Sequence, residues 1–212
     1  MSDEIVVEVH DTEPADPDEG FTRAELLERT VVAGGVIAAG GVLVTGLPRL
    51  AAAAPSRTQD VEVLNFALLL ESLQATFYAE ALRVGGLTGE RRQFAEVVGG
   101  QERAHRAYLR RTLGSRARSV PRFRVAQAVG GDERFVAAAT ALEDLGLAAY
   151  NGQATNLTRP ALRATARLIS VEARHAAWIR DLGGRQPAPD ASDAAASEEE
   201  VRRSLRRQGL LG

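Results

Sequence analysis

The sequence lacks several residue types that common functional sites need. Cysteine is absent, which excludes disulfides, thiolate metal sites and a cysteine nucleophile. This absence leaves the compartment open, because an exported protein need not contain disulfides. Lysine is also absent, so all 26 basic residues are arginine, and histidine occurs only three times. Any site built on imidazoles must therefore use His10, His105 or His175.

Charge is distributed unevenly along the 212 residues. Residues 1–20 hold eight acids and no base, although the net charge of the chain is only −2, so the remainder is basic. With Pro14 and Pro17, this composition predicts an acidic, disordered leader over residues 1–29. The arginines of the remainder are scattered along helical faces with little aromatic interleaving, which argues against nucleic acid as a partner.

Residues 30–48 form an uncharged run that is rich in valine, isoleucine, alanine and glycine. Arg23 and Arg29 precede the run, and small residues up to Ala54 follow it. This order predicts a signal peptide or membrane anchor over residues 30–54. The run is near the lower length limit for a spanning helix. An uncleaved anchor is the second interpretation, and a buried core helix is the least favoured.

The segment before this run is similar to a twin-arginine export signal. Residues 22–27 read Thr-Arg-Ala-Glu-Leu-Leu, so Arg23 is present but Ala24 replaces the second arginine. We therefore expect an exported or envelope-associated protein that carries a degenerate signal. The export route is left open, and the chain is membrane-anchored through residues 30–48 if the signal is not cleaved.

From about residue 59 the spacing of apolar residues becomes helical. Glycines and other breakers separate four segments. These segments predict helices over residues 59–84, 88–113, 132–151 and 158–182. The connection from 115 to 131 is predicted to be non-helical and is long enough to run along a bundle. Residues 184–212 are predicted to be a linker and a short charged helix in a solvated tail.

Two Glu-x-x-His motifs carry most of the functional information. Each follows a lone glutamate by 29 to 31 residues, and each lone glutamate precedes a tyrosine by seven residues. The first half contains Glu71, Tyr78, Glu102 and His105, and the second contains Glu143, Tyr150, Glu172 and His175. Because residues three apart in a helix share a face, each motif projects a carboxylate and an imidazole together.

All four glutamates interrupt stripes of apolar residues, so we expect them to face the core of the bundle. Burying four unpaired carboxylates is very costly, on the order of 20 kcal/mol per ion in the idealised case. Two histidines cannot neutralise them, whereas two divalent cations can. The ligand types suit iron or manganese, with zinc as a competitor. Tyr78 and Tyr150 are either core residues with hydrogen-bonded hydroxyls, or residues that contact the metal ligands or have a redox role one to two turns from the metals.

On these residues, the chain resembles the ferritin-like superfamily over about residues 59–183. More narrowly, it is similar to the exported bacterial ferritin-like proteins, a group that includes desiccation-related proteins. The resemblance implies an all-α, ferritin-like four-helix bundle with a long connection between its second and third helices. It implies two iron or two manganese ions, with Glu71 and Glu143 as single ligands, Glu102 and Glu172 as bridges, and His105 and His175 as one imidazole per ion.

Two functions are compatible with this resemblance. The first is an oxidoreductase, either a di-iron oxidase or ferroxidase or an enzyme like the dimanganese catalases, with oxygen or peroxide as substrate in envelope stress protection. The second is a non-catalytic metal-binding or structural stress protein. An iron-storage shell is the least favoured, because the chain carries an export leader and a ragged tail. A homodimer is left open.

Overall fold

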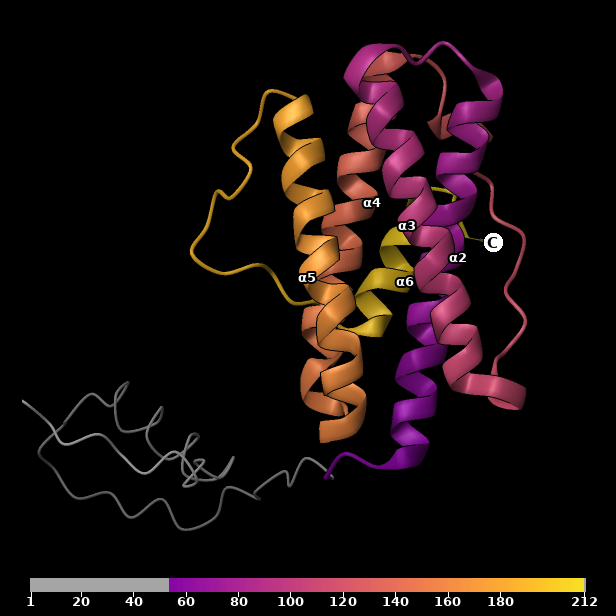
Figure 1. The fold of residues 1–212 in the computed structure, drawn as a ribbon, viewed down its shortest axis with the longest axis vertical. Helices are drawn as coiled ribbons and strands as arrows, with labels where there is room; N and C mark the ends of the chain where they lie inside the picture. Colours follow the sequence, from indigo (N-terminus) through magenta and orange to yellow (C-terminus); the bar gives the residue numbers. More distant parts are fainter. Residues whose placement is uncertain (1–53, 212) are drawn as a thin grey trace, which may run out of the picture. The chain divides into compact units, whose positions relative to one another are not determined.

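The predicted all-α fold is confirmed. A computed structural model describes residues 54–211, and within that range it contains helices but no strand (Figure 1). The α-helices are α2 (Arg57–Val84), α3 (Gly89–Leu113), α4 (Asp132–Gln153), α5 (Arg159–Leu182) and α6 (Glu198–Arg207). Among the described residues, no helix has the length and apolarity to cross a membrane. The acidic leader and the apolar run of residues 30–48 lie outside the described residues.

The four long helices form two antiparallel hairpins, α2 with α3 and α4 with α5. The connection after α3 returns along the bundle to the start of α4, so α3 and α4 run in the same direction (Figure 1). This connection contains two short 3-10 turns, Gly114–Arg116 and Ala126–Ala128, which were not predicted. The buried side chain of Asn65 on α2 accepts the N–H of Arg118 at 2.7 Å and so holds the start of the connection against the bundle.

Local signals set where the helices begin. The Ser56 hydroxyl caps α2 by accepting the N–H of Gln59 at 3.2 Å. At the start of α5, the N–H and hydroxyl of Thr158 donate to Asp60 of α2 at 2.8 and 2.6 Å. Pro160 stands in the first turn of α5, where the N–H that it lacks has no helical partner. These contacts join the first turns of α2 and α5.

The core consists of two apolar layers separated by a polar middle. Phe77, Tyr78, Phe94 and Phe135 pack in the first layer with ring centroids 5.1–6.4 Å apart. The second layer is centred on buried aliphatic residues with the ring of Tyr150, and its members include Leu64, Leu68, Leu109, Leu113 and Leu168. Along each long helix, the predicted carboxylate lies between the residues of these two layers. Such a position is closed to bulk water.

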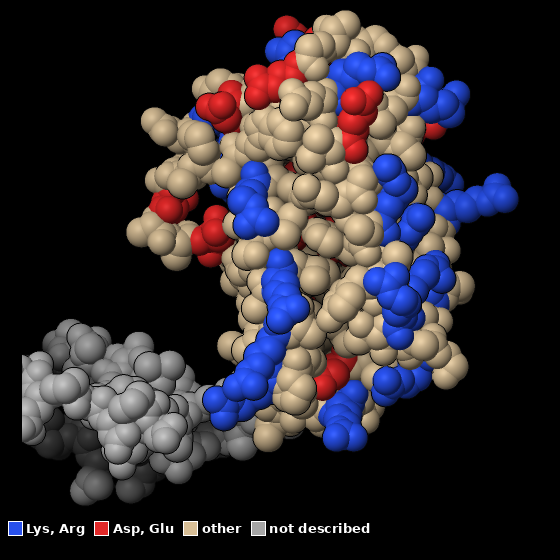
Figure 2. Space-filling model, viewed as in Figure 1, with Lys and Arg blue, Asp and Glu red and all other residues tan. Residues whose placement is uncertain are grey.

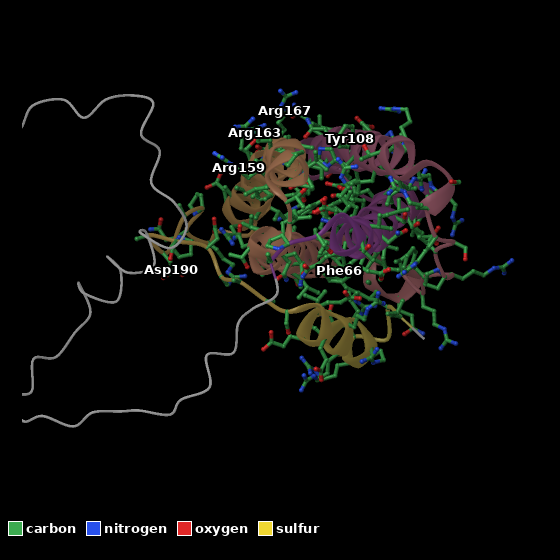
Figure 3. The ribbon with its side chains drawn as sticks, turned by 90° about the horizontal axis from the view of Figure 1, so that it is seen from below. Phe66, Tyr108, Arg159, Arg163, Arg167 and Asp190 are labelled. Carbon is green, nitrogen blue, oxygen red and sulfur yellow. The ribbon has the colours of Figure 1, made fainter. Side chains whose placement is uncertain are left out.

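The C-terminal segment packs against the bundle, and the prediction of a solvated tail is wrong for it. In α6, Val201 and Leu205 are fully buried, and Leu210 and Leu211 after it are buried as well. The helix lies beside Phe66 of α2, on the opposite side of the bundle from α5 (Figure 3). Burial of these apolar side chains against the core outweighs the high charge of the segment.

The outward face of α5 carries a row of arginines. Arg159, Arg163 and Arg167 recur every four residues and are exposed on one side of the helix (Figure 3). Figure 2 shows arginines along this side of the bundle, over α5 and α3, with acidic side chains gathered more toward one end. Because the arginines point outward, the opposite face of α5, with Glu172 and His175, points into the bundle.

We expect the Leu205→Ala substitution in α6 to lower the free energy of unfolding by about 2–5 kcal/mol, because it leaves a cavity at a fully buried site. Urea denaturation measures this loss. The exposed neighbour Arg207, substituted by alanine, is the control and should change stability little. Equal stabilities of the two variants would contradict the packing of α6 on the core.

Candidate metal centre

The structure brings all six predicted ligands together at the middle of the bundle. Two groups of side chains could each hold a metal ion, and within each group the ligand atoms lie within 4.8 Å of one another. The first group is Glu71, Glu102, His105 and Glu172, and the second is Glu102, Glu143, Glu172 and His175. Every one of the four long helices supplies one carboxylate, and the two carboxylates of the Glu-x-x-His motifs belong to both groups.

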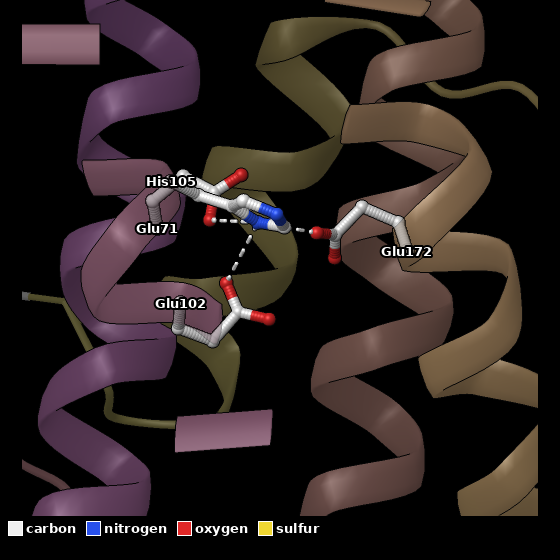
Figure 4. Close-up of side chains that lie close together, drawn as sticks. All are labelled: Glu71, Glu102, His105 and Glu172. Carbon is white, nitrogen blue, oxygen red and sulfur yellow. Dashed lines mark ion pairs between the residues drawn. The ribbon is translucent and has the colours of Figure 1, made fainter. Parts of the chain in front are cut away.

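The first group, here called the His105 position, is arranged around one nitrogen (Figure 4). His105 Nδ1 lies 3.0 Å from Glu172 Oε1 and 3.3 Å from Glu71 Oε2. It lies 3.7 Å from Glu102 Oε2 on its own helix. Ligands about 2.1 Å from a shared ion are themselves roughly 3 to 4 Å apart, so these spacings are suitable for one ion.

The second group, here called the His175 position, repeats the first. His175 Nδ1 lies 3.0 Å from Glu102 Oε1, 3.5 Å from Glu143 Oε2 and 3.8 Å from Glu172 Oε2. Glu102 and Glu172 therefore each turn one oxygen toward each histidine. The two imidazole rings are inclined to each other by 26°, with centroids 6.2 Å apart. This arrangement is the one that two bridging carboxylates between two ions require.

The donor atoms that face this space have no hydrogen-bond partner among the described residues. Both oxygens of Glu102 and Glu172, one oxygen each of Glu71 and Glu143, and Nδ1 of both histidines are buried and unpaired. All four carboxylates are completely inaccessible to solvent. Unpaired buried carboxylates are very costly, and metal ions are the partners that this donor set suits. The residues present therefore fit a metal centre.

The two predicted tyrosines contact ligands of the opposite hairpin. The Tyr78 hydroxyl donates to Glu143 Oε1 and the Tyr150 hydroxyl to Glu71 Oε1, both at 2.5 Å. Burial, and then the adjacent carboxylate, raise the pKa of each phenol well above its ordinary value, so both remain donors. Glu71 and Glu143, which each belong to one group only, are here called the terminal glutamates. One oxygen of each accepts a tyrosine hydroxyl, and the other faces the space between the six ligands.

Two glutamines at the site were missed by the sequence analysis. Gln74 Nε2 donates to Glu143 Oε1 at 3.2 Å, and Gln101 Oε1 lies 2.5 Å from His175 Nε2. Gln74 could have been found, because it is three residues after Glu71 and so lies on the same face. Gln101 could not, because only the packing of α3 against α5 places it beside His175.

The comparison with protein families agrees with this geometry. A family model described as a ferritin-like domain matches residues 59–185, which is more than half of the chain. The chain belongs to the ferritin-like domain family. Among curated proteins, no match to this sequence was found. The resemblance to the ferritin-like superfamily is thus confirmed, whereas the desiccation-related subgroup stays a prediction.

Without metal, this ferritin-like site holds protons at unusually high pH. Burial raises the pKa of Glu71 to about 8, and the charge of Glu102 adds to the effect. Burial also raises the pKa of Glu143. Burial opposes the charged form of His105, but the close carboxylates of Glu102, Glu172 and Glu71 outweigh it and raise its pKa to about 12. The same balance raises the pKa of His175 to about 11.

These shifts predict how the stability of the metal-free ferritin-like domain depends on pH. The ordinary pKa values are 4.5 for Glu71 and 6.5 for the histidines. The folded state therefore binds more protons than the unfolded chain from about pH 5, through Glu71, up to about pH 11, through the histidines. The free energy of unfolding therefore falls as the pH rises through this range. A divalent ion that binds to such donors must displace their protons.

We expect Mn(II) to raise Tm more at about pH 8 than at about pH 6, because fewer protons compete with the ion at the higher pH. Thermal unfolding with and without Mn(II), followed by the fluorescence of Trp178, measures this difference. A Glu96→Ala chain, changed at an exposed glutamate of the same helix as Glu102, should behave like the unmodified chain. An equal rise at both pH values would contradict the exchange of protons for metal.

Proposed function

We propose that this protein is a dinuclear iron or manganese protein that reacts with oxygen or peroxide in protection of the cell envelope against stress. The observation that carries the proposal is the pair of shared carboxylates, Glu102 and Glu172, whose four unpaired oxygens are divided between two histidines. Membership of the ferritin-like domain family supports a metal protein of this fold.

Two ions rather than one are supported by charge and by geometry. Four carboxylates that are completely buried carry four negative charges when they are ionised, and two divalent ions offset them with neutral imidazoles as further donors. A single ion would offset two of these charges and leave the other two to protons held by the site. One ion would also leave the Nδ1 of one histidine with carboxylate oxygens as its only close neighbours.

The residues around the site have three roles in this proposal. The hydroxyls of Tyr78 and Tyr150 orient the terminal glutamates, and Gln101 orients His175. The aromatic layer formed by Phe77, Phe94 and Phe135 covers one end of the site and excludes water. Two ions of iron or manganese, when bound, supply redox chemistry with oxygen or peroxide in such a dry site.

A non-catalytic role as a metal-stabilised structural protein is the alternative. Metal binding can contribute folding free energy directly, so bound ions alone do not establish turnover. The site joins all four long helices, which is what a structural metal would do. The location at the envelope depends on residues 30–54, and cell fractionation of the full-length chain, with and without those residues, tests it.

We expect the unmodified chain to bind about two metal ions after reconstitution with Fe(II) or Mn(II), and a Glu102→Ala/Glu172→Ala chain to bind almost none, because both positions lose their shared ligands. Metal analysis after gel filtration measures the content. The control is a Glu96→Ala/Glu133→Ala chain, in which two exposed glutamates of α3 and α4 are removed. Equal metal content in all three chains would contradict the site.

We further expect the reconstituted chain to consume oxygen or peroxide over many turnovers. An oxygen electrode and a peroxide assay measure this consumption, and the Glu102→Ala/Glu172→Ala chain provides the background rate. A chain that binds two ions and gains thermal stability from them, but consumes neither oxidant above background, would support the structural alternative instead.

A further inference from the structure

The two halves of the site follow the same pattern, but two positions of that pattern differ. Three residues after each terminal glutamate, α2 has Gln74 and α4 has Gly146. Immediately before each Glu-x-x-His motif, α3 has Gln101 and α5 has Val171. At each of these two places, one half of the site has a glutamine and the other half has a residue without a polar side chain. The His175 and His105 positions can therefore be compared residue by residue.

Both glutamines serve the His175 position. Gln74 donates to Glu143 Oε1, which also accepts the hydroxyl of Tyr78, so this oxygen has two donors. Glu71 Oε1, its counterpart, has Tyr150 as its one donor among the described residues. A Cβ at Gly146 would lie 3.2 Å from Gln74 Nε2, so the glycine leaves the room that Gln74 occupies.

The two histidines differ in the hydrogen-bond partner of Nε2, and again the partner is at the His175 position. Gln101 presents its carbonyl oxygen to His175 Nε2 at 2.5 Å. When Nε2 carries the hydrogen that this oxygen accepts, the lone pair of the neutral ring is on Nδ1, toward the carboxylates. No hydrogen bond to His105 Nε2 is found within residues 54–211, where Val171 takes the place of a glutamine.

The side chains of the two histidines also differ in their exposure to solvent. The side chain of His105 is 12% exposed, whereas that of His175 is 4% exposed and the four carboxylates are at 0%. His105 is thus the most exposed of the six ligands. Within residues 54–211 its Nε2 has no hydrogen bond, whereas Nε2 of His175 contacts Gln101.

We propose that the His175 position binds its metal ion first and tightly, and that the His105 position is the weaker, exchangeable one. Gln74 and Gln101 are positioning residues for the tight ion, because they fix its terminal glutamate and its imidazole. This inference rests on the dinuclear centre proposed above. It adds an order of loading and assigns the exchange of metal to the more exposed position.

Titration of the metal-free, full-length chain with Mn(II) tests the proposal, with the EPR signal of unbound Mn(II) as the readout. We expect two binding steps that differ at least about tenfold in affinity, as partners of metal ligands commonly contribute. A His105→Ala chain should lose the weaker step and keep the tighter one, which assigns each step to its position.

Gln101→Val is the decisive variant, since valine is the residue at the matching place in the other half. We expect it to weaken the tight step about 10- to 100-fold and to change the weak step little. Gln74→Leu, of similar size, provides a second variant and should weaken the same step. The reciprocal Val171→Gln substitution should strengthen the weak step. Far-UV circular dichroism of each metal-free chain checks that it folds.

Two results would overturn the inference and can be told apart. Two ions bound with equal affinity, or variants of Gln101 and Gln74 that weaken both steps alike, would contradict the unequal positions and leave the dinuclear centre standing. No Mn(II) bound by the unmodified chain would overturn the dinuclear centre, and this inference with it.

Discussion

The burial of four carboxylates in one helical core is the constraint on which the rest of this structure depends. Each long helix places a glutamate between an aromatic layer and an aliphatic one, where no solvent reaches it. Such an arrangement is unfavourable for the fold unless the charges are offset. The shared carboxylates, the inward imidazoles and the buried phenols are arrangements that offset them, through metal ions, protons or hydrogen bonds.

The two hairpins are interdependent at the site. Tyr78 on α2 donates to a glutamate of α4, and Tyr150 on α4 donates to a glutamate of α2. Each histidine is likewise nearest to the Glu-x-x-His carboxylate of the other hairpin rather than to its own. Neither hairpin therefore holds a complete ligand set by itself. Binding of metal at this site would therefore be coupled to the packing of the two hairpins, and not only to the formation of the helices.

Much of this arrangement was predictable because it depends on helical spacing. Apolar periodicity placed the long helices within about two residues of their ends, and the i, i+3 spacing brought the six candidate ligands onto inward faces. The burial of α6 was missed because Val201 and Leu205 are its two apolar residues among charged ones. Their spacing of four marks an apolar stripe, but only the surface formed by the other helices determines whether it is buried. Gln101 was missed for a related reason, since its contact is made between helices.

The asymmetry of the site helps to separate the two proposed functions. In a metal site that only joins helices, each further fixed ligand partner adds to metal affinity and so to stability. Here one position has two glutamines that its counterpart lacks, and the other has a more exposed histidine. A less constrained position next to a rigid one retains freedom to change its coordination, as a substrate would require. The structural alternative gains nothing from that freedom, so the unequal positions favour the proposal of a reactive centre.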